Sequence, residues 1–106
     1  MSTNVHHRLL LTGAAGGLGQ ALRGRLKANC DILRLSDLRP FGDAGPGEEV
    51  VLADLADAAA VHTMVEGVDA IVHLGGVSVE APFAPILAAN IAGLYHLYEA
   101  ARRAGL

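Results

Sequence analysis

The chain has 106 residues, of which 52% are hydrophobic and 18% charged, and its formal net charge is -3 at pH 7. These values predict one folded domain of residues 1–106 and exclude a disordered chain. The negative charge argues against a nucleic-acid partner, and the lack of an apolar run of about 20 residues argues against a membrane span. No signal peptide is expected, because only three leucines follow Arg8 and glycine comes almost at once. The lone Cys30 excludes an internal disulfide and favours a reducing, cytoplasmic location.

Apolar runs and turn-forming residues alternate along the chain in a pattern of strands and helices. Short apolar runs predict strands, and apolar residues at four-residue spacing predict helices. Asp57 is expected to cap the second helix, and Gly67 to end it. In chain order the expected elements are a strand at 8–12, a helix at 18–28, a strand at 31–37, a glycine- and proline-rich loop, a strand at 49–54, a helix at 58–66, a strand at 69–76 and a helix at 83–104.

Two helices carry an apolar stripe that is expected to face the sheet. In the first helix this stripe consists of Leu18, Leu22 and Leu26. Tyr95 and Tyr98 in the last helix are interpreted as packing residues because of their spacing. The stripe of the last helix is expected to consist of Ile86, Leu87, Ile91, Leu94, Leu97, Tyr98 and Ala101.

The alternation of elements predicts how the strands are arranged. Strands that alternate with helices and are apolar over most of their length are typical of a parallel sheet covered on both faces. Right-handed crossovers favour the spatial order 3-2-1-4, which places the turn after the first strand at the ligand-binding carboxyl edge of the sheet. We therefore predict an α/β fold, a Rossmann-type doubly wound parallel sheet truncated after about four strands.

The first strand runs directly into the glycine-rich segment TGAAGGLG, residues 12–19. Gly13 permits a tight turn, Gly16 leaves room for a pyrophosphate beside the backbone, and Gly19 allows the next helix to pack closely on the strand. The free N–H groups of the first helical turn are expected to face the phosphates. The strand before this segment and the helix after it favour dinucleotide binding over an ordinary glycine-rich loop.

Asp37 ends the second predicted strand, about 20 residues beyond the glycines, where a carboxylate can accept both hydroxyls of an adenosine ribose. It would repel a 2′-phosphate and therefore favours NAD over NADP as the cofactor. Arg39, two residues later, is able to accommodate that phosphate. A solvated carboxylate at the end of a strand is the alternative interpretation of Asp37.

The segment TGAAGGLG resembles the TGxxGxxG fingerprint of the short-chain dehydrogenase/reductase superfamily, in its extended branch, the epimerase/dehydratase family. ADLAD, HLGG and NIAGLYHLYEAAR are similar to later motifs of that branch, so the resemblance covers nearly the whole chain. Within the branch, ILRLSDL, DLADAAAV, IVHLGGVSVEAPF and LYEAAR resemble bacterial uronate dehydrogenases. The resemblance implies oxidation of glucuronate or galacturonate at C1 to an aldarolactone, with hydride transfer to NAD.

The resemblance also implies which residues hold the cofactor. Asp54 and Leu55 would border the adenine, and Asp54 would accept from its amino group. Leu74, Gly75 and Gly76 would line the path towards the nicotinamide ribose. The pyrophosphate loop would consist of Gly13, Gly16, Gly17, Leu18 and Gly19.

Two polar residues beyond the fourth strand are implied near the substrate. Ser78 would meet the sugar acid, and Asn90 would tie the last helix to the backbone of the active site. Both have plain alternatives, an ordinary loop serine and a hydrogen-bonded core amide. The histidines show no ligand spacing, so no metal site is expected.

The Tyr-x-x-x-Lys pair that catalyses hydride transfer in this superfamily is absent, since Tyr95 and Tyr98 are followed at that distance by Glu99 and Arg102. No catalytic residue is therefore assigned, and the chain is interpreted as the amino-terminal, cofactor-binding part of a longer oxidoreductase. The alternatives are a nucleotide-sugar epimerase or dehydratase of the same branch and a non-catalytic module that senses NAD. An open edge on the fourth strand and an uncovered stripe on the last helix predict self-association or marginal stability of this chain, and a homo-oligomeric parent.

Overall fold

Helices and strands alternate throughout the structure, a computed structural model that describes residues 4–106. The strands run parallel in one sheet, in the order β3-β2-β1-β4, which confirms the predicted doubly wound α/β arrangement. The elements are β1 (His6–Thr12), α1 (Gly17–Lys27), β2 (Cys30–Ser36), β3 (Glu48–Val50), α2 (Ala58–Val65), β4 (Ala70–His73), α3 (Phe83–Ile86), a π-helical segment (Leu87–Ala92) and α4 (Gly93–Arg103).

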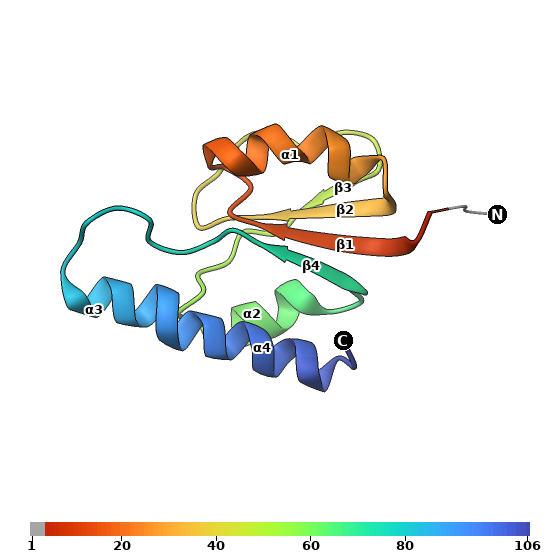
Figure 1. Ribbon diagram of the computed structural model, residues 1–106. Coiled ribbons are helices and arrows are strands. Elements are labelled where there is room, and N and C mark those ends of the chain that lie inside the picture. The colour runs from red at the N-terminus through yellow and green to blue at the C-terminus, as the bar shows by residue number, and fades with distance from the viewer. Residues whose placement is uncertain (1–3) are drawn as a thin grey trace.

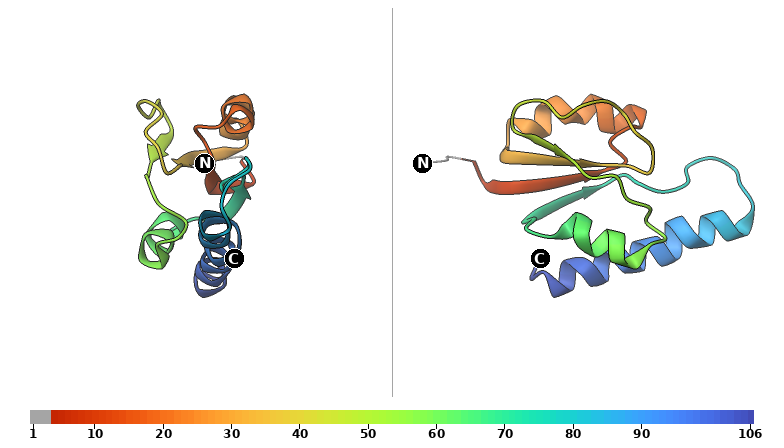
Figure 2. Two further views of the ribbon diagram at one scale, coloured as in Figure 1. Left: turned by 90° about the vertical axis from the view of Figure 1, so that its left-hand side faces the viewer. Right: turned by 180° about the vertical axis from the view of Figure 1, so that it is seen from behind.

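Helices cover both faces of the sheet (Figure 1). α1 lies over one face, and α2 and α4 lie side by side over the other (Figure 2). β1 contributes to both cores because successive residues of a strand point to opposite faces. Leu9 and Leu11 pack on the side of α1, together with Leu26 of that helix, whereas Leu10 packs under α2 and α4. Burial on both sides explains the unbroken apolar run of β1.

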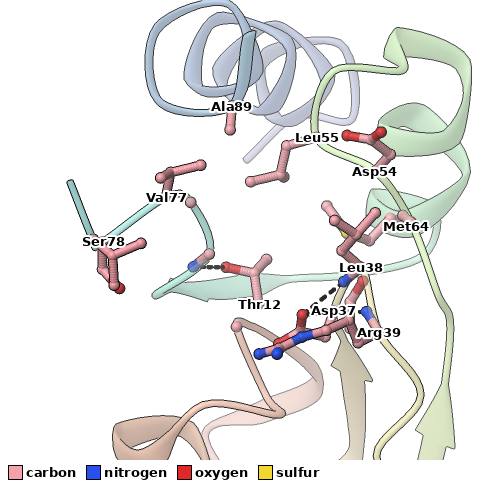
Figure 3. Close-up of a pocket in the computed structure, with 16 residues that line it drawn as sticks. Thr12, Asp37, Leu38, Arg39, Asp54, Leu55, Met64, Val77, Ser78 and Ala89 are labelled. Carbon is pink, nitrogen blue, oxygen red and sulfur yellow. Dashed lines mark hydrogen bonds between the residues drawn. The ribbon is translucent and has the colours of Figure 1, made fainter. Parts of the chain in front are cut away.

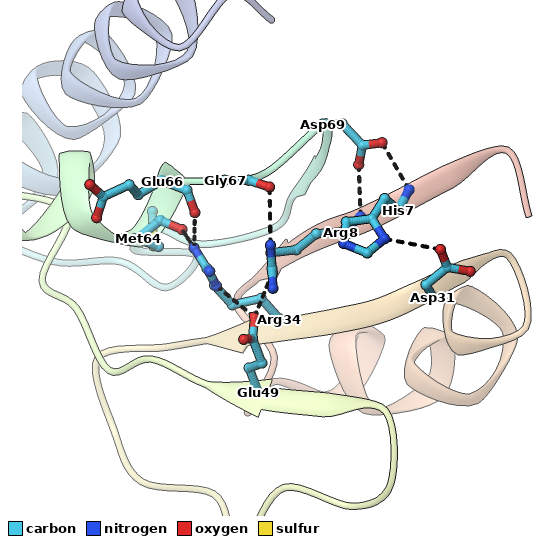
Figure 4. A network of polar contacts seen from close by, with 9 residues as sticks. All are labelled: His7, Arg8, Asp31, Arg34, Glu49, Met64, Glu66, Gly67 and Asp69. Carbon is cyan, nitrogen blue, oxygen red and sulfur yellow. Dashed lines mark hydrogen bonds and ion pairs between the residues drawn. The ribbon is translucent and has the colours of Figure 1, made fainter. Parts of the chain in front are cut away.

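A polar network links three strands to the end of α2 (Figure 4). Glu49 of β3 accepts from Arg8 at 2.9 Å and from Arg34 at 3.1 Å, and Arg34 also donates to the carbonyls of Met64 and Glu66. The Arg34 side chain is only 11% exposed, so these bonds replace the water that its charge requires. Desolvation opposes ionisation of Glu49, but the hydrogen bonds from both arginines outweigh it and hold the pKa of Glu49 below its usual value.

Two strands are shorter than predicted. β3 covers Glu48–Val50 rather than residues 49–54. The segment that follows makes only two isolated backbone hydrogen bonds, to the carbonyls of Leu35 and Asp37, before the chain turns towards α2. β4 covers Ala70–His73 rather than residues 69–76, because the next two backbone amides donate to the hydroxyl of Thr12. Both strands therefore end where the chain begins to form the carboxyl edge of the sheet.

The stripe predicted for α1 is wrong at its first position. Leu18 is 60% exposed, whereas Leu22 is half-buried and Leu26 packs against the core. Leu18 lies in the first turn of α1, which projects past the ends of the strands (Figure 1).

The last helix is continuous, but its buried face differs from the predicted stripe. Its central segment, Leu87–Ala92, is π-helical, and such a wide turn shifts the phase of the residues that follow. α4 is buried through Leu97 and the small residues Gly93 and Ala100, and most of its other apolar side chains lie on an outward flank, part of which lines the open groove beside β4. The interpretation of the two tyrosines as packing residues is therefore wrong. The outward flank consists of Ile91, 57% exposed, Leu94, 36%, Tyr95, 65%, and Tyr98, 70%.

β4 forms an edge of the sheet, because among the described strands it pairs only with β1. A groove of about 510 Å³ runs between this strand and α4, with Ile71, Leu94 and Tyr98 in its wall. This agrees with the open edge and the uncovered helix face expected from the sequence. None of the helices in residues 4–106 is long and apolar enough to cross a membrane.

Candidate functional site

A pocket of about 390 Å³ opens at the carboxyl edge of the sheet (Figure 3). Its volume lies in the range of small-molecule sites. It forms beside the ends of β1 and β4, where the order of the strands reverses and open α/β sheets bind their ligands. The pocket brings together these residues predicted for the site: Gly13, Asp37, Asp54, Leu55, Gly75, Gly76 and Ser78.

The other predicted residues lie around the pocket. Leu74 packs against the core on the side of α1, and Asn90 lies in the π-helical segment. The remaining positions, at the start of α1, are Gly16, Gly17, Leu18 and Gly19.

Two glycines of the turn between β1 and α1 are needed for steric reasons. Gly13 adopts a φ of 68°, and a Cβ there would lie 2.7 Å from the backbone carbonyl carbon of Leu74. A Cβ at Gly19 would overlap the carbonyl oxygen of Gly13 and lie 2.9 Å from Cα of Ala14. At Gly16 a Cβ would meet only the Gly13 oxygen, at 3.4 Å. The glycines thus bring the start of α1, the end of β1 and the turn after β4 into close contact.

The first turn of α1 presents backbone N–H groups that have no acceptor inside the helix. The first helical bond runs from Gln20 N to the carbonyl of Gly16 at 3.0 Å, so the N–H groups of Gly17, Leu18 and Gly19 precede it. Gly16 occupies the N-cap without a capping side chain, and the first turn carries no acidic residue. These donors and the positive end of the helix dipole suit an anionic ligand.

Asp37 joins the end of β2 to the glycine turn. Its Oδ2 accepts from the backbone N–H of Ala15 at 2.9 Å, and its Oδ1 accepts from Leu38 N at 2.7 Å. A carboxylate offers about four lone-pair sites, so Asp37 keeps acceptor capacity towards the pocket that it lines. Arg39, which is exposed, lies in the same wall.

α4 positions the Asp54–Leu55 segment in the opposite wall of the pocket. His96 donates its Nδ1–H to the carbonyl of Leu55 at 2.9 Å, since a carbonyl only accepts. A Cβ at Gly93 would lie 2.8 Å from Cβ of Leu55, so glycine permits this close approach. No role was expected for Gly93 or His96. The sequence does carry a signal for Gly93, because a glycine inside a predicted helix costs about 1 kcal/mol of stability relative to alanine and therefore points to a packing role.

Thr12 holds the turn after β4, which forms the floor of the pocket (Figure 3). Its Oγ1 accepts from Leu74 N at 2.9 Å and from Gly75 N at 3.0 Å, and it lies 2.6 Å from Nδ1 of His73. Thr12 is only 2% exposed, and a buried hydroxyl requires partners. The signal for this residue in the sequence is a polar residue that ends an apolar strand directly before the glycine turn. Burial lowers the pKa of His73.

Asn90 ties the last helix to the loop beyond this turn. Its Oδ1 accepts from Val77 N at 2.7 Å, and its Nδ2 donates to the carbonyl of Val77 at 2.8 Å, as in the hydrogen bonding between two strands. Gly76 has a φ of 136°, and a Cβ there would lie 2.7 Å from Oδ1 of Asn90. Ser78 follows as an exposed residue of the pocket wall. Asn90 thereby holds the last helix to the loop that follows β4.

The pocket presents groups that can bind a polar ligand. Asp37 and Asp54 supply negative charge, whereas Tyr95 and Tyr98 lie on the outward flank of α4. In the part of the chain that the structure describes, no group of three or more His, Cys, Asp or Glu side chains is placed to hold a metal. The arrangement suits a ligand that carries phosphate groups and neighbouring hydroxyls.

Comparisons with known proteins agree with this geometry. The profile of the NAD dependent epimerase/dehydratase family matches residues 9–106. Uronate dehydrogenase of Pseudomonas putida (strain KT2440) is 62% identical over 107 residues, which cover 100% of this chain and 40% of that protein. The crystal structure of uronate dehydrogenase from Agrobacterium tumefaciens superimposes with a TM-score of 0.91 at 63% identity, over 93% of this chain and 37% of that one, and a mutant of that enzyme is known in complex with NAD. A dTDP-glucose 4,6-dehydratase from Streptomyces venezuelae, with NAD bound, superimposes with a TM-score of 0.81 at 28% identity, over 93% of this chain and 37% of that one.

The chain spans 40% or less of the length of these relatives. The matched residues nevertheless include the glycine turn, Asp37, the turn after β4 and Asn90, which together form and support the pocket. The chain therefore belongs to the NAD-dependent epimerase/dehydratase family.

Proposed function

We propose that residues 1–106 form the NAD-binding domain of a uronate dehydrogenase-like oxidoreductase. The observation that carries this proposal is the bond from Ala15 N to Asp37, which joins the glycine turn to a carboxylate at the wall of one pocket. Asp37, which can face the ribose hydroxyls, thereby fixes the position of the glycine turn, which can face the phosphates. Identities of 62% and 63% to uronate dehydrogenases support the class of substrate.

The described residues fit a dinucleotide. Asp37 would accept both hydroxyls of the adenosine ribose, and Asp54 and Leu55 would border the adenine. Gly75 and Gly76 would leave room for the nicotinamide ribose. The pyrophosphate would lie against the loop of Gly13, Gly16, Gly17, Leu18 and Gly19.

In the proposed reaction, the ring form of glucuronate or galacturonate loses a hydride from C1 and a proton from the C1 hydroxyl, and becomes the aldarolactone. NAD, when bound, supplies the acceptor of this hydride. Ser78, in the pocket wall, would orient the carboxylate or a ring hydroxyl of the sugar acid. Asn90 would support this contact by holding the backbone of Val77, the residue before Ser78. No residue of this chain is assigned to proton transfer.

A second candidate is a nucleotide-sugar dehydratase or epimerase, and the likeness to the dTDP-glucose 4,6-dehydratase supports it. The two reactions differ in what happens to NAD. A dehydrogenase releases NADH with each turnover, whereas an epimerase or dehydratase of this branch returns the hydride and keeps its cofactor oxidised. Accumulation of NADH with a uronate therefore separates them.

The same proposal includes a cytoplasmic location and association between copies. Cys30, the single cysteine, is buried and free, as suits a reducing compartment. The open edge of β4 and the outward flank of α4 supply apolar surface that a second polypeptide can cover.

Titration of the protein with NAD, followed by calorimetry, tests the cofactor assignment. Gly16→Val should weaken binding by about 100-fold or more, because its side chain would occupy the approach of the pyrophosphate and each lost hydrogen bond to a charged group costs about 1.5–3 kcal/mol. Gly24→Val is the matched control, because a Cβ at this exposed position of α1 meets nothing within 4 Å. Unchanged affinity in folded Gly16→Val would contradict the assignment of the phosphate loop.

The reaction is tested with the whole oxidoreductase of which residues 1–106 would be the amino-terminal part, because no residue of this chain is assigned to proton transfer. It is mixed with NAD and a hexuronic acid, and absorbance from NADH is followed. Formation of NADH together with the aldarolactone is the expected result. Binding of NAD without oxidation of either uronate, or of any nucleotide sugar, would instead favour a module that only senses NAD.

A further inference from the structure

The hydroxyl of Thr12 determines the protonation of its neighbour, His73. A hydroxyl has one proton and two lone pairs. Both lone pairs accept amide protons, from Leu74 N at 2.9 Å and Gly75 N at 3.0 Å, so the single proton points at the third partner, Nδ1 of His73, at 2.6 Å. Nδ1 of His73 is therefore an acceptor, and the imidazole is neutral with its proton on Nε2.

His73 reaches this hydroxyl because it lies directly opposite Thr12 in the parallel pairing of β1 and β4. Its ring faces the groove under α4 and is half-buried beside Leu94 and Leu97. Burial lowers the pKa of His73 below its ordinary 6.5, which agrees with a neutral ring. Protonation of the ring is therefore opposed by the hydroxyl of Thr12 on the side of β1 and by burial against apolar side chains on the side of α4.

Few charged or titratable groups face the same groove. α4 contributes Tyr98 and Arg102, and Asp69, the residue before β4, lines the groove as well. Glu99 holds Arg102 at 2.6 Å, and backbone amides hold the carboxylate of Asp69. On the side of β1, the polar partner of His73 is Thr12.

Protonation of His73 would disturb the floor of the pocket. A proton on Nδ1 would meet the hydroxyl proton, so the hydroxyl would have to rotate and accept from the imidazolium, releasing Leu74 N or Gly75 N. The turn has little room to adjust, because a Cβ at Gly13 would already lie 2.7 Å from the Leu74 carbonyl carbon and a Cβ at Gly75 would lie 3.3 Å from the Thr12 oxygen.

We propose that His73 is a positioning residue for the cofactor, which acts through Thr12 on the turn of Leu74, Gly75 and Gly76 and permits tight dinucleotide binding only while its ring is neutral. This inference rests on the proposed binding of NAD in the pocket. His73 itself lies outside the pocket wall, so its effect on affinity passes through the threonine.

Titration with NAD at about pH 8 and about pH 5.5, on either side of the usual pKa of histidine, tests the inference. The wild type should lose affinity at the lower pH, by less than about tenfold because the pKa of His73 lies below 6.5 and only part of the rings is protonated there. His73→Asn places an amide oxygen where Nδ1 lies and does not titrate, so it should bind NAD with wild-type affinity at the higher pH and keep that affinity at the lower one. His73→Phe should bind weakly at both, and His62→Asn, on α2, should keep the pH dependence of the wild type.

NMR of the ring nitrogens of His73 provides a second readout that does not require the cofactor. The neutral tautomer with a proton on Nε2 is expected, and a proton on Nδ1 at about pH 8 would overturn the inference. NAD binding that has the same pH dependence in His73→Asn as in the wild type, or full affinity in His73→Phe, would overturn it as well. If the wild type binds no NAD at either pH, the proposed function fails and the inference fails with it. If NAD binds but its affinity does not depend on the residue at position 73, the inference alone is overturned.

Discussion

At the scale of single residues, neighbouring glycines of one helical turn meet different surroundings. A Cβ at Gly19 would overlap the carbonyl oxygen of Gly13, whereas a Cβ at Gly17 meets nothing within 4 Å. Both glycines lie in the segment TGAAGGLG, where Gly19 occupies a glycine position of the TGxxGxxG fingerprint and Gly17 a variable one. In the structure, Gly19 is needed for close packing, whereas Gly17 can contribute only its backbone N–H to ligand binding.

Gly19→Ala should therefore destabilise the protein by about 1–3 kcal/mol, the usual cost of overpacking against a fixed backbone. Gly17→Ala should be neutral or stabilise it by about 0.5 kcal/mol, because alanine is the better helix former. The free energy of unfolding in urea measures both changes. Equal losses in the two variants would contradict the packing described for Gly19.

The carboxylate of Asp37 is the residue expected to exclude the 2′-phosphate of NADP. Asp37→Asn keeps an oxygen that can accept from Ala15 N or Leu38 N but removes the negative charge. The ratio of NADP to NAD affinity should rise by about tenfold, with Arg39 free to face the phosphate. Competitive titration with both cofactors measures this ratio, and an unchanged ratio would remove Asp37 from the specificity of the site.

At the scale of elements, an ion pair holds α1 to β3. Arg23 donates to Glu48 from Nε and Nη2, each at 2.7 Å, and the Glu48 side chain is only 4% exposed. The hydrogen bonds from Arg23 outweigh the cost of burial and hold the pKa of Glu48 at about 2, against an ordinary 4.5. Because folding lowers this pKa, the pair stabilises the fold above about pH 4.5 and loses its contribution as the pH falls towards 2.

Glu48→Gln should therefore flatten the pH dependence of stability between about pH 4.5 and pH 2, where the wild type loses at most about 3 kcal/mol from this group. Urea unfolding at several pH values measures the difference between the two proteins. Because the other carboxylates titrate in both proteins, the difference between their unfolding free energies gives the contribution of Glu48 alone. A variant that keeps the full acid dependence would show that Arg23 and Glu48 contribute nothing to stability.

The π-helical segment carries the contact between the last helix and the pocket. Asn90→Ala should cost about 1–3 kcal/mol, because it leaves two half-buried backbone groups of Val77 without their partners. Ile91→Ala, at the next position, should cost less than about 1 kcal/mol, because Ile91 is 57% exposed. Unfolding free energies compare the pair, and a larger effect at Ile91 would contradict the tie through Asn90.

At the scale of the whole molecule, the exposed edge of β4 and the outward flank of α4 form one apolar region. The 106-residue chain is expected to associate with itself through this region, so its thermal midpoint should rise with protein concentration. Tyr98→Glu places a charge on the flank and should abolish this dependence, whereas Ala21→Glu, on α1 at the opposite face, should keep it. Sedimentation and thermal unfolding measure both, and a wild type that melts as a monomer at every concentration would contradict the expectation.

Much of the fold and part of the site follow from local patterns in the sequence. The alternation of elements, combined with the fixed hand of crossovers, is sufficient to predict the order β3-β2-β1-β4. That order alone places the glycine turn and Asp37 at one edge of the sheet, where the structure finds the pocket. These features depend on periodicity and handedness, which act over short stretches of chain.

Only the tertiary structure decides which side chains complete the site. Thr12 and His73 are separated by 61 positions, and His96 and Leu55 by 41, yet each pair forms one hydrogen bond. The phase of α4 and the exposure of its tyrosines also depend on a π-helical turn that the apolar spacing does not reveal. Such contacts arise because strands and helices distant in sequence pack face to face, and no local pattern records which residues then meet.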